Sequence, residues 1–405
     1  MRREHGFSLL EMTIAMGLTM VVVASVFSIM NPAQGAFAVE PEVADMQQRL
    51  RVAEDMLFKD LVMAGAGAYI GGQTGSLNYF FAPVLPFRQG AVGDAPNGSF
   101  ARHGGPPDTT DTITVIYVPS TTVQTTLRTA VIGGGPLHVN RESDCPAGQS
   151  LCGFKVGMTV LIFDNNGNYD TFTINSVADA AGDITVNKPP DAATTTYAVG
   201  SKVVQAISRT YFLKKDSAAR LYQLVSYDGS TGPDVPVVDN VVDLSFEYWG
   251  DPNPPLRTTK PLTDPVGPWT TYGPKPPVAG LKPTAYPAGE NCVFLLSPPE
   301  TGLPAPRLAL LPSGTNSNTL VKLTEAQVTD GPWCPDVASA NRFDADLLRI
   351  RKIAVNVRVQ AALSAMRGPA SVLFRYGGTS TSATRWIPDQ ELKFQVSPRN
   401  LNLGR

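Results

Sequence analysis

One carboxylate stands inside the only long apolar segment of the chain. Residues 7–30, from Phe7 to Met30, include a single charged side chain, that of Glu11. An ionised carboxylate in the hydrocarbon of a bilayer is costly in free energy. A residue that costs this much is usually retained because something needs it, so Glu11 is the first candidate functional residue.

A second set of candidate ligands lies in the segment DNNGNYD. Oxygen-bearing side chains recur at alternate positions, as they do in calcium-binding loops, at Asp164, Asn166, Asn168 and Asp170. Tyr169 stands where the EF-hand pattern requires glycine, and an Asn-Gly pair is typical of a tight hairpin turn. The turn of a β-hairpin is the preferred prediction, and calcium is the alternative. No other cofactor is expected.

Signatures of enzymatic chemistry are missing from the sequence. The chain has three histidines, no G-x-S-x-G motif, and a GGGP segment that no Lys-Ser or Lys-Thr pair follows. Its 33 basic and 35 acidic residues give a net charge of −2, which favours neither nucleic acid nor an anionic lipid surface. We expect a protein that is not an enzyme and has no nucleic-acid partner.

The N-terminus admits three interpretations. Arg2 and Arg3 precede the apolar segment, which places the N-terminus in the cytoplasm and the rest of the chain outside it. The sequence AFA at residues 36–38 is typical of a signal-peptide cleavage site, but the apolar segment exceeds the usual length and contains a glutamate. A simple membrane anchor is long enough, yet it leaves Glu11 without a role.

The third interpretation is a resemblance. The segment GFSLLEMTIAMGLTMVVVASVF resembles the N-termini of type IV prepilins and type II secretion pseudopilins. Gly6 ends a short basic leader, Phe7 matches the first mature residue, and Glu11 matches the family's acidic position. The resemblance implies that a prepilin peptidase cleaves between Gly6 and Phe7 and that the Phe7 amine is methylated. It also implies that Glu11 pairs with the Phe7 amine of a neighbouring subunit, since such charges attract strongly at low dielectric.

A long helix must carry these residues. Apolar side chains recur at steps of three and four, which predicts a helix with one apolar face, at Val43, Met46, Leu50, Ala53, Leu57, Leu61 and Ala64. The predicted polar face holds Gln47, Arg49, Arg51, Glu54, Asp55, Lys59 and Asp60. A helix from Phe7 to Ala64 would be roughly 85 Å long. Pro32 and Pro41 predict a kink or break between its two halves.

After Gly67 the pattern changes to strands. Residues 111–118, 242–248 and 353–359 alternate in polarity, and residues 203–229 predict a hairpin with its turn near 216–219. A short helical turn is predicted near 343–348. Few helices interrupt these strands, so we expect an α+β fold with a long N-terminal helix packed on an antiparallel sheet.

The expected domains follow from these elements. We predict a leader at 1–6, a transmembrane half-helix at 7–30, an amphipathic half-helix at 31–66 and a β-rich head at 67–405. Within the head, segments 130–202 and 251–340 have the character of insertions. The first contains at least three short strands, and the second is rich in proline.

Four cysteines fit two disulfides in an exported head. None lies in a C-x-x-C pair, which argues against structural zinc. Three connectivities are possible, and we favour the pairs that are close in sequence, Cys145–Cys152 and Cys292–Cys334. Four free thiols are the alternative if the head faces the cytoplasm.

The head sharpens the resemblance. Segments including AEDMLFKDLVMAGAG and VVDNVVDLSFEYW resemble large minor pilins of the W type and J-type minor pseudopilins. The resemblance implies a structural subunit that initiates or caps a type IV pilus. Its implied partners are the prepilin peptidase, major and minor pilins and the assembly platform of the bacterial inner membrane, and the subunit ends in the filament or its tip. A type II secretion pseudopilin and a tip adhesin are the alternatives.

Overall fold

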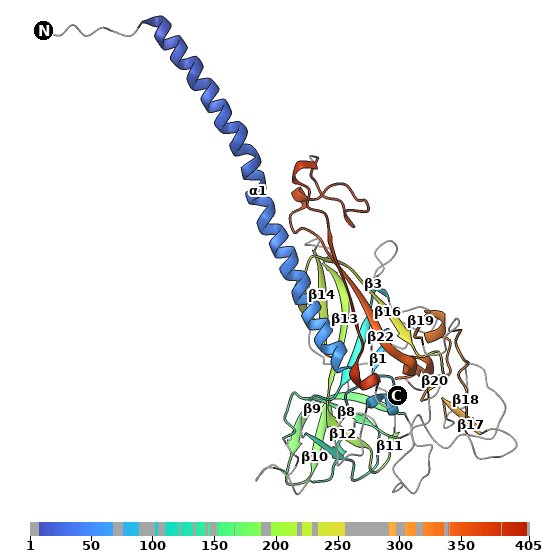
Figure 1. Ribbon diagram of the computed structural model, residues 1–405. Coiled ribbons are helices and arrows are strands. Elements are labelled where there is room, and N and C mark those ends of the chain that lie inside the picture. The colour runs from blue at the N-terminus through green and yellow to red at the C-terminus, as the bar shows by residue number, and fades with distance from the viewer. Residues whose placement is uncertain are drawn as a thin grey trace. The chain divides into compact units, whose positions relative to one another are not determined.

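The computed structural model shows one long helix and several antiparallel sheets (Figure 1). Its described residues are 8–67, 76–88, 102–103, 110–120, 123–132, 135–141, 145, 151, 153–165, 167–187, 196–216, 221–228, 234–255, 291–296, 304–312, 319–335, 339, 341–381 and 383–402. The predicted α+β class is confirmed. The chain forms two compact units, Met1–Arg51 with Val359–Gln390, and Val52–Arg358 with Glu391–Arg405.

Helix α1 spans Leu9–Met63 as a single element. The predicted helix is therefore confirmed. Of the kink or break predicted at Pro32 and Pro41, the break is wrong. Each proline removes only one backbone hydrogen bond, and the turns on both sides of it keep theirs. The helix ends before Gly65, whose φ of 75° belongs to the left-handed region that glycine adopts at helix ends. A Cβ at this position would lie 2.8 Å from Leu401 Cδ2, so the close packing there also requires glycine.

The first sheet of the larger unit has the order β1-β4-β13-β14-β15. Its antiparallel strands are β1 (Val84–Leu85), β4 (Ile113–Tyr117), β13 (Ile207–Asp216), β14 (Leu221–Tyr227) and β15 (Val235–Asp239). The predicted hairpin is β13 and β14, which pair up to Asp216 and Leu221. All five residues of β4 are buried, so both faces of this strand are covered.

The second sheet has the order β19-β16-β22-β23. Its strands are β19 (Val321–Leu323), β16 (Val241–Gly250), β22 (Ile350–Val359) and β23 (Gln390–Val396). The predicted apolar faces of β16 and β22 are buried, which confirms the period-two pattern. The 3-10 turn η4 (Ala345–Arg349) lies where the helical turn was predicted, and η1 (Leu77–Tyr79) and η7 (Arg399–Leu401) are further single turns.

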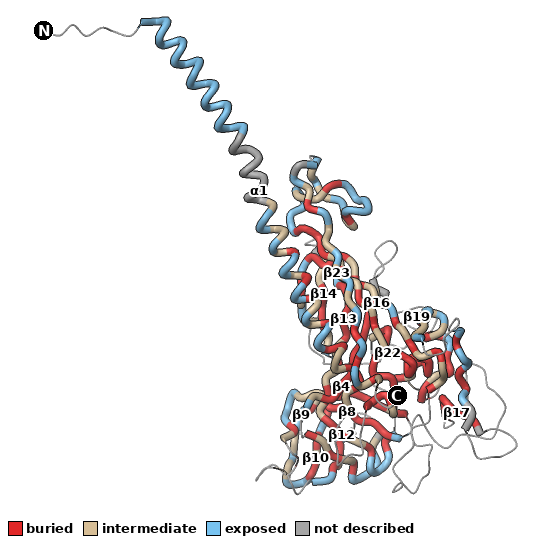
Figure 2. Tube along the Cα trace, in the orientation of Figure 1, coloured by how far each residue is buried: buried red, intermediate tan, exposed pale blue. Residues whose placement is uncertain are grey.

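The sheet that contains the first predicted insertion, 130–202, runs from Gln124 to Gln205 and has an apolar core. Its strands, in the order β5-β12-β8-β9-β10-β7, are β5 (Gln124–Thr126), β12 (Lys202–Gln205), β8 (Thr159–Phe163), β9 (Tyr169–Ala178), β10 (Asp183–Asn187) and β7 (Leu137–His138). A two-stranded ladder joins β11 (Thr196–Tyr197) to β6 (Val131–Ile132). Buried Leu137, Phe172 and Ile184 belong to the apolar cluster that these strands share. This cluster gives the sheet an apolar core within the larger unit, and Figure 2 shows buried residues along its strands.

The second predicted insertion is described only in part. Its described elements are β17 (Phe294–Leu296), β18 (Pro304–Pro306), η3 (Ala326–Val328) and β20 (Trp333–Cys334), which pairs with β21 (Phe343–Asp344). Elsewhere β2 (Arg102–His103) pairs with β3 (Thr110–Asp111), and η5 (Ser364–Met366) and η6 (Ala383–Arg385) lie between β22 and β23. Four predicted site residues, Gly6, Phe7, Cys152 and Asn166, lie outside the described residues.

Candidate assembly site on the N-terminal helix

Glu11 and Ser8 form a reciprocal pair at the start of α1. The Ser8 backbone N–H donates to Glu11 Oε2 over 2.9 Å, and the Glu11 backbone N–H donates to Ser8 Oγ over 3.2 Å. This is the capping box in which a serine precedes the helix and a glutamate occupies its third position. The S-x-x-E spacing of Ser8 and Glu11 is a sequence signal from which this cap could have been predicted. Glu11 therefore has a partner in its own chain.

Residues Leu9–Ser28 form an apolar stretch long enough to cross a membrane. At 1.5 Å per residue, 20 residues rise about 30 Å, which is the thickness of the hydrocarbon core. Every side chain in this stretch is exposed. The hydroxyl groups bond back to the helix at 2.7–2.9 Å: Thr13 to the Leu10 carbonyl, Thr19 to Ala15, Ser25 to Val21 and Ser28 to Ser25. These internal partners suit a helix in apolar surroundings.

The C-terminal part of α1 buries the face that the sequence predicted. Met46, Leu50, Ala53, Leu57 and Leu61 are all buried, as is Ala64 directly after the helix, and Val43 is half-buried. An apolar stripe of this width is what a helix needs to pack against a core. The amphipathic pattern therefore located the buried face correctly.

Asp60 corrects the predicted polar face. It is only 7% exposed, and both carboxylate oxygens accept hydrogen bonds from tyrosine hydroxyls. Tyr117 of β4 donates to Oδ1 over 2.8 Å, and Tyr211 of β13 donates to Oδ2 over 2.6 Å. Asp60 follows Leu57 by three residues, so it lies beside the buried stripe rather than opposite it. The helical pattern alone could not predict that the hydroxyls of Tyr117 and Tyr211 would lie next to this carboxylate.

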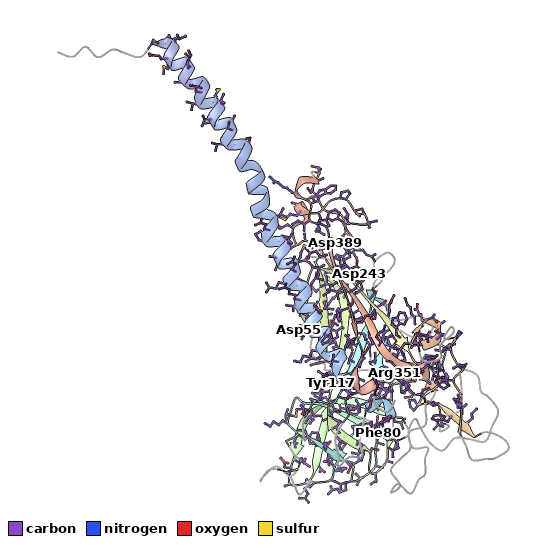
Figure 3. All side chains as sticks on the ribbon, in the orientation of Figure 1. Asp55, Phe80, Tyr117, Asp243, Arg351 and Asp389 are labelled. Carbon is purple, nitrogen blue, oxygen red and sulfur yellow. A yellow bond between two sulfur atoms is a disulfide. The ribbon has the colours of Figure 1, made fainter. Side chains whose placement is uncertain are left out.

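Burial and the nearby Asp60 carboxylate both act on these tyrosines. Burial, followed by the charge of Asp60, raises the pKa of Tyr117 and of Tyr211. The neutral phenols therefore remain donors to the carboxylate throughout the physiological pH range. Asp55, five residues before Asp60, is exposed and provides a matched carboxylate without this burial (Figure 3).

The DNNGNYD segment connects β8 to β9, whose last pair is Phe163 and Tyr169. Asp164 accepts from the Asn168 backbone N–H at Oδ1 and from the Asn168 amide at Oδ2, over 3.0 and 2.9 Å. Asp170 is buried and accepts from the Tyr197 hydroxyl over 2.9 Å and from the Asn341 amide. The hairpin prediction is confirmed, and these protein donors engage both carboxylates. The calcium alternative stays a prediction.

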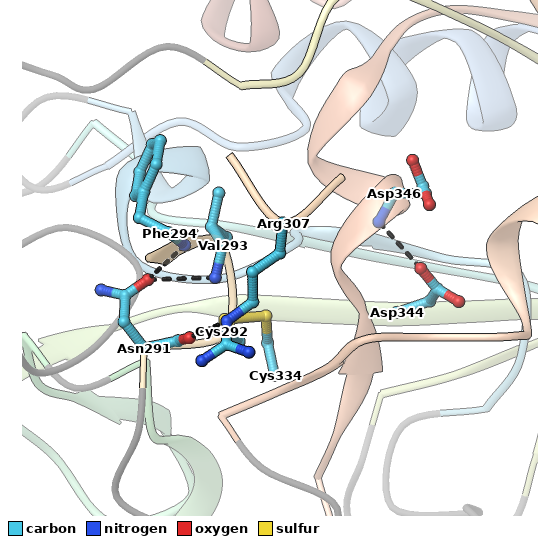
Figure 4. Close-up of a disulfide and its surroundings, with 8 residues drawn as sticks. All are labelled: Asn291, Cys292, Val293, Phe294, Arg307, Cys334, Asp344 and Asp346. Carbon is cyan, nitrogen blue, oxygen red and sulfur yellow. Dashed lines mark hydrogen bonds between the residues drawn. A yellow bond between two sulfur atoms is a disulfide. The ribbon is translucent and has the colours of Figure 1, made fainter. Parts of the chain in front are cut away.

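A disulfide joins Cys292 to Cys334 across 42 residues of sequence (Figure 4). Beside it, Asn291 Oδ1 accepts from the backbone N–H groups of Val293 and Phe294 over 3.0 and 2.9 Å. Arg307 Nε donates to the Asn291 carbonyl over 2.7 Å. The disulfide has the connectivity favoured from the sequence. It joins the residues around Cys292 to those around Cys334 within the proline-rich segment, and the Asn291 hydrogen bonds order the residues beside Cys292. Cys145 is also disulfide-bonded, while its predicted partner Cys152 lies outside the described residues.

Three carboxylates that sequence analysis missed gather in the same region. One oxygen from each of Asp330, Asp344 and Asp346 lies within 4.8 Å of the others. Burial raises the pKa of Asp344 well above its usual range, and burial also raises the pKa of Asp346 to about 6. Buried Arg349 pairs with Asp346 and donates to the carbonyls of Pro252 and Ala309 over 2.9 and 2.6 Å. Arg349 thereby connects η4 to two segments of the proline-rich region.

Comparison with known proteins gives one match. Residues 1–27 match the family described as the prokaryotic N-terminal methylation motif. No significantly similar curated protein or solved structure was found. The matched segment contains Gly6, Phe7 and Glu11 and continues into the apolar part of α1. The motif and the apolar helix together support a type IV pilin or pseudopilin, which is a structural subunit and is processed by a prepilin peptidase.

Proposed function

We propose that this protein is a minor pilin that helps to initiate a type IV pilus or occupies its tip. The observation that carries the proposal is the N-terminal methylation motif on residues 1–27, continued by a helix that is apolar and exposed from Leu9 to Ser28. A helix of this kind must be covered by lipid before assembly and by other subunits afterwards.

Glu11 is the proposed assembly residue. In the membrane-inserted monomer its carboxylate is held by the Ser8 backbone N–H. During assembly the same carboxylate pairs with the methylated Phe7 amine of a neighbouring subunit, because a cation and an anion attract strongly where the dielectric is low. The exchange of a local partner for a charged one would favour assembly in register.

Size supports a terminal rather than a repeated position. The β-rich head exceeds 300 residues and includes the additional sheet of β5, β12, β8, β9, β10 and β7. A head this large would crowd a tightly wound shaft. The expected partners are a major pilin, other minor pilins and the inner-membrane assembly platform. A minor pseudopilin of a type II secretion system shares the motif and is the alternative.

Mass spectrometry of the N-terminal peptide tests the processing step. We expect the membrane-extracted chain to begin at N-methylated Phe7. A chain that begins at Phe37 or Val39, or that retains Met1, would remove the filament proposal.

Incorporation into sheared filaments tests the role of Glu11. We expect Glu11→Ala to be inserted and processed but excluded from filaments, with Asp55→Ala as the matched control on the exposed face of the same helix. Equal recovery of both variants would contradict the role.

Counting labelled subunits tests the position of the protein in the filament. We expect few copies, at one end of each filament, whereas regular labelling along the shaft would contradict a terminal position.

A further inference from the structure

The segment between β22 and β23, residues 360–389, forms a small lobe in the same compact unit as the N-terminal part of α1. We call it the 360–389 lobe. The lobe is ordered by its own contacts: Phe374 and Ile387 are buried, and the rings of Phe374 and Trp386 meet edge to face at 5.7 Å. Further bonds close it, including Ile387 N–H to the Met366 carbonyl over 2.8 Å.

The lobe presents two large apolar side chains at the tip of a tight turn. Ser371 and Phe374 exchange backbone hydrogen bonds of 3.0 and 3.1 Å, which leaves Val372 and Leu373 at the tip. Val372 is 91% exposed, more than any other large apolar residue of the described chain, and Leu373 is 51% exposed. Tight turns usually carry glycine, proline, asparagine, aspartate or serine. A valine and a leucine held there in water indicate a surface that something covers.

The charge of the lobe is opposite in sign to that of the whole chain. The lobe contains Arg367, Arg375 and Arg385 but only one acidic residue, Asp389, so its formal charge is +2, whereas the chain carries −2. Arg385 is exposed. Asp389 accepts from the Arg375 backbone N–H over 2.7 Å and donates its own N–H to the Leu373 carbonyl over 3.0 Å, which fixes the base of the tip. Apolar tips flanked by arginine fit an anionic lipid surface.

The lobe is attached to α1 within reach of the membrane. The Ala362 backbone N–H donates to Glu42 of α1, and the lobe lies beside the helix as a largely exposed loop (Figure 2). Glu42 lies fourteen positions after Ser28, the last residue of the apolar stretch. This is about 21 Å of helix and less in height when the helix tilts. Headgroups cover about 5–8 Å of that height. In Figure 1 the lobe extends from the end of β22 along α1 toward the N-terminal end of the helix, so the folded lobe itself covers part of the remaining distance.

We propose that the tip of the 360–389 lobe, Val372 and Leu373, inserts into the interface of the membrane that α1 spans, with Arg385 near the lipid phosphates. The subunit would then be held at the membrane surface by two contacts until assembly withdraws it. This inference depends on the membrane insertion of α1, but not on the position of the subunit in a filament.

Depth-dependent quenching in vesicles tests the contact. The full-length chain carrying Val372→Cys, labelled with an environment-sensitive fluorophore, is reconstituted into phosphatidylcholine vesicles containing phosphatidylglycerol and brominated lipid. The described cysteines are disulfide-bonded, which leaves the new thiol as the labelling site among them. Val199→Cys is the control, since Val199 is also a valine in a described loop and is 64% exposed.

We expect several-fold stronger quenching at position 372 than at position 199. The difference should shrink when Arg385→Glu is added or when salt is raised, since salt screens the attraction to anionic lipid. Equal quenching at the two positions overturns the inference. Chemical cross-linking from the cysteine at position 372 provides a second test. Cross-links to another copy of the chain would also overturn the inference, because they would assign the tip to a contact between subunits.

Flotation of the chain with the vesicles separates the two proposals. A chain that does not float lacks the membrane insertion on which the proposed function depends. A chain that floats but shows no excess quenching at position 372 contradicts the inference alone. Val372→Ser with Leu373→Ser should leave the unfolding midpoint unchanged, because both side chains are exposed, and should reduce membrane contact when the fluorophore is placed at Ser371→Cys.

Discussion

Glu11 and Asp60 are carboxylates in the two parts of one helix, and each stands next to residues that are apolar. Glu11 is exposed, and among the described residues its capping bonds join it to Ser8 alone. Asp60 is buried and accepts hydrogen bonds from tyrosines 57 and 151 residues away in the chain. Asp60 thus has its partners once the chain has folded, whereas the partner proposed for Glu11 belongs to another subunit. A carboxylate among apolar residues of a helix can therefore indicate either a partner within the folded chain or a partner in another subunit.

Replacing Asp60 is expected to have the largest effect on stability. Asp60→Ala leaves the Tyr117 and Tyr211 hydroxyls buried without their acceptor, which should lower the free energy of unfolding by about 2–5 kcal/mol. Urea unfolding of the detergent-solubilised chain measures the change, with Asp55→Ala as the exposed control. If both variants lost the same small amount of unfolding free energy, Asp60 would not stabilise the fold, and the contrast between Asp60 and Glu11 would be wrong.

Single tyrosine replacements should cost less and should reveal whether the two bonds cooperate. We expect Tyr117→Phe and Tyr211→Phe each to lower the free energy of unfolding by about 1–2 kcal/mol, because each removes one donor and leaves the other. The double variant, compared with the singles in a mutant cycle, measures their coupling. Strict additivity would indicate two independent bonds.

The Asp330, Asp344 and Asp346 cluster extends the comparison to carboxylates that lie close to one another. The folded-state pKa of Asp346 is about 6 and that of Asp344 is also raised, so the folded chain holds these protons more tightly than the unfolded chain. The contribution of Asp346 to stability is full below its unfolded pKa near 4 and is lost as the pH rises through 6, by about 3 kcal/mol, and the raised pKa of Asp344 adds a loss of the same sign. We expect Asp344→Asn to make the slope of the unfolding free energy against pH less negative between pH 4 and 6, as measured by urea unfolding across that range. An unchanged slope would contradict the raised pKa values.

The smallest expected effect on folding is that of Glu11. Glu11→Ala and Ser8→Ala remove a cap at one exposed end of α1 and should leave the unfolding midpoint of the head unchanged. Thermal unfolding in detergent measures this. A clear fall in the midpoint for Glu11→Ala would mean that Glu11, like Asp60, acts in folding, and any loss of assembly would then need a different explanation.

Local sequence patterns predicted much of the fold. The three-and-four spacing identified the buried face of α1, and period-two alternation identified the buried faces of β16 and β22. The S-x-x-E spacing at Ser8 was equally available. These features depend on residues within a few positions of one another, so the sequence displays them directly. The break predicted at Pro32 and Pro41 did not occur, because the loss of one backbone hydrogen bond at each proline is small against the many bonds of a 55-residue helix.

The sequence by itself determined the methylation motif, the apolar stretch that can span a membrane, and the positions of the main strands. Only the tertiary structure decided which carboxylates are buried and what they contact. Asp60 accepts a hydrogen bond from Tyr211, Asp346 pairs with Arg349, and the Leu373 carbonyl at the exposed tip accepts the backbone N–H of Asp389. The physical reason is that burial and hydrogen bonding join residues far apart in the chain, and a sequence pattern carries no information about which distant group will arrive.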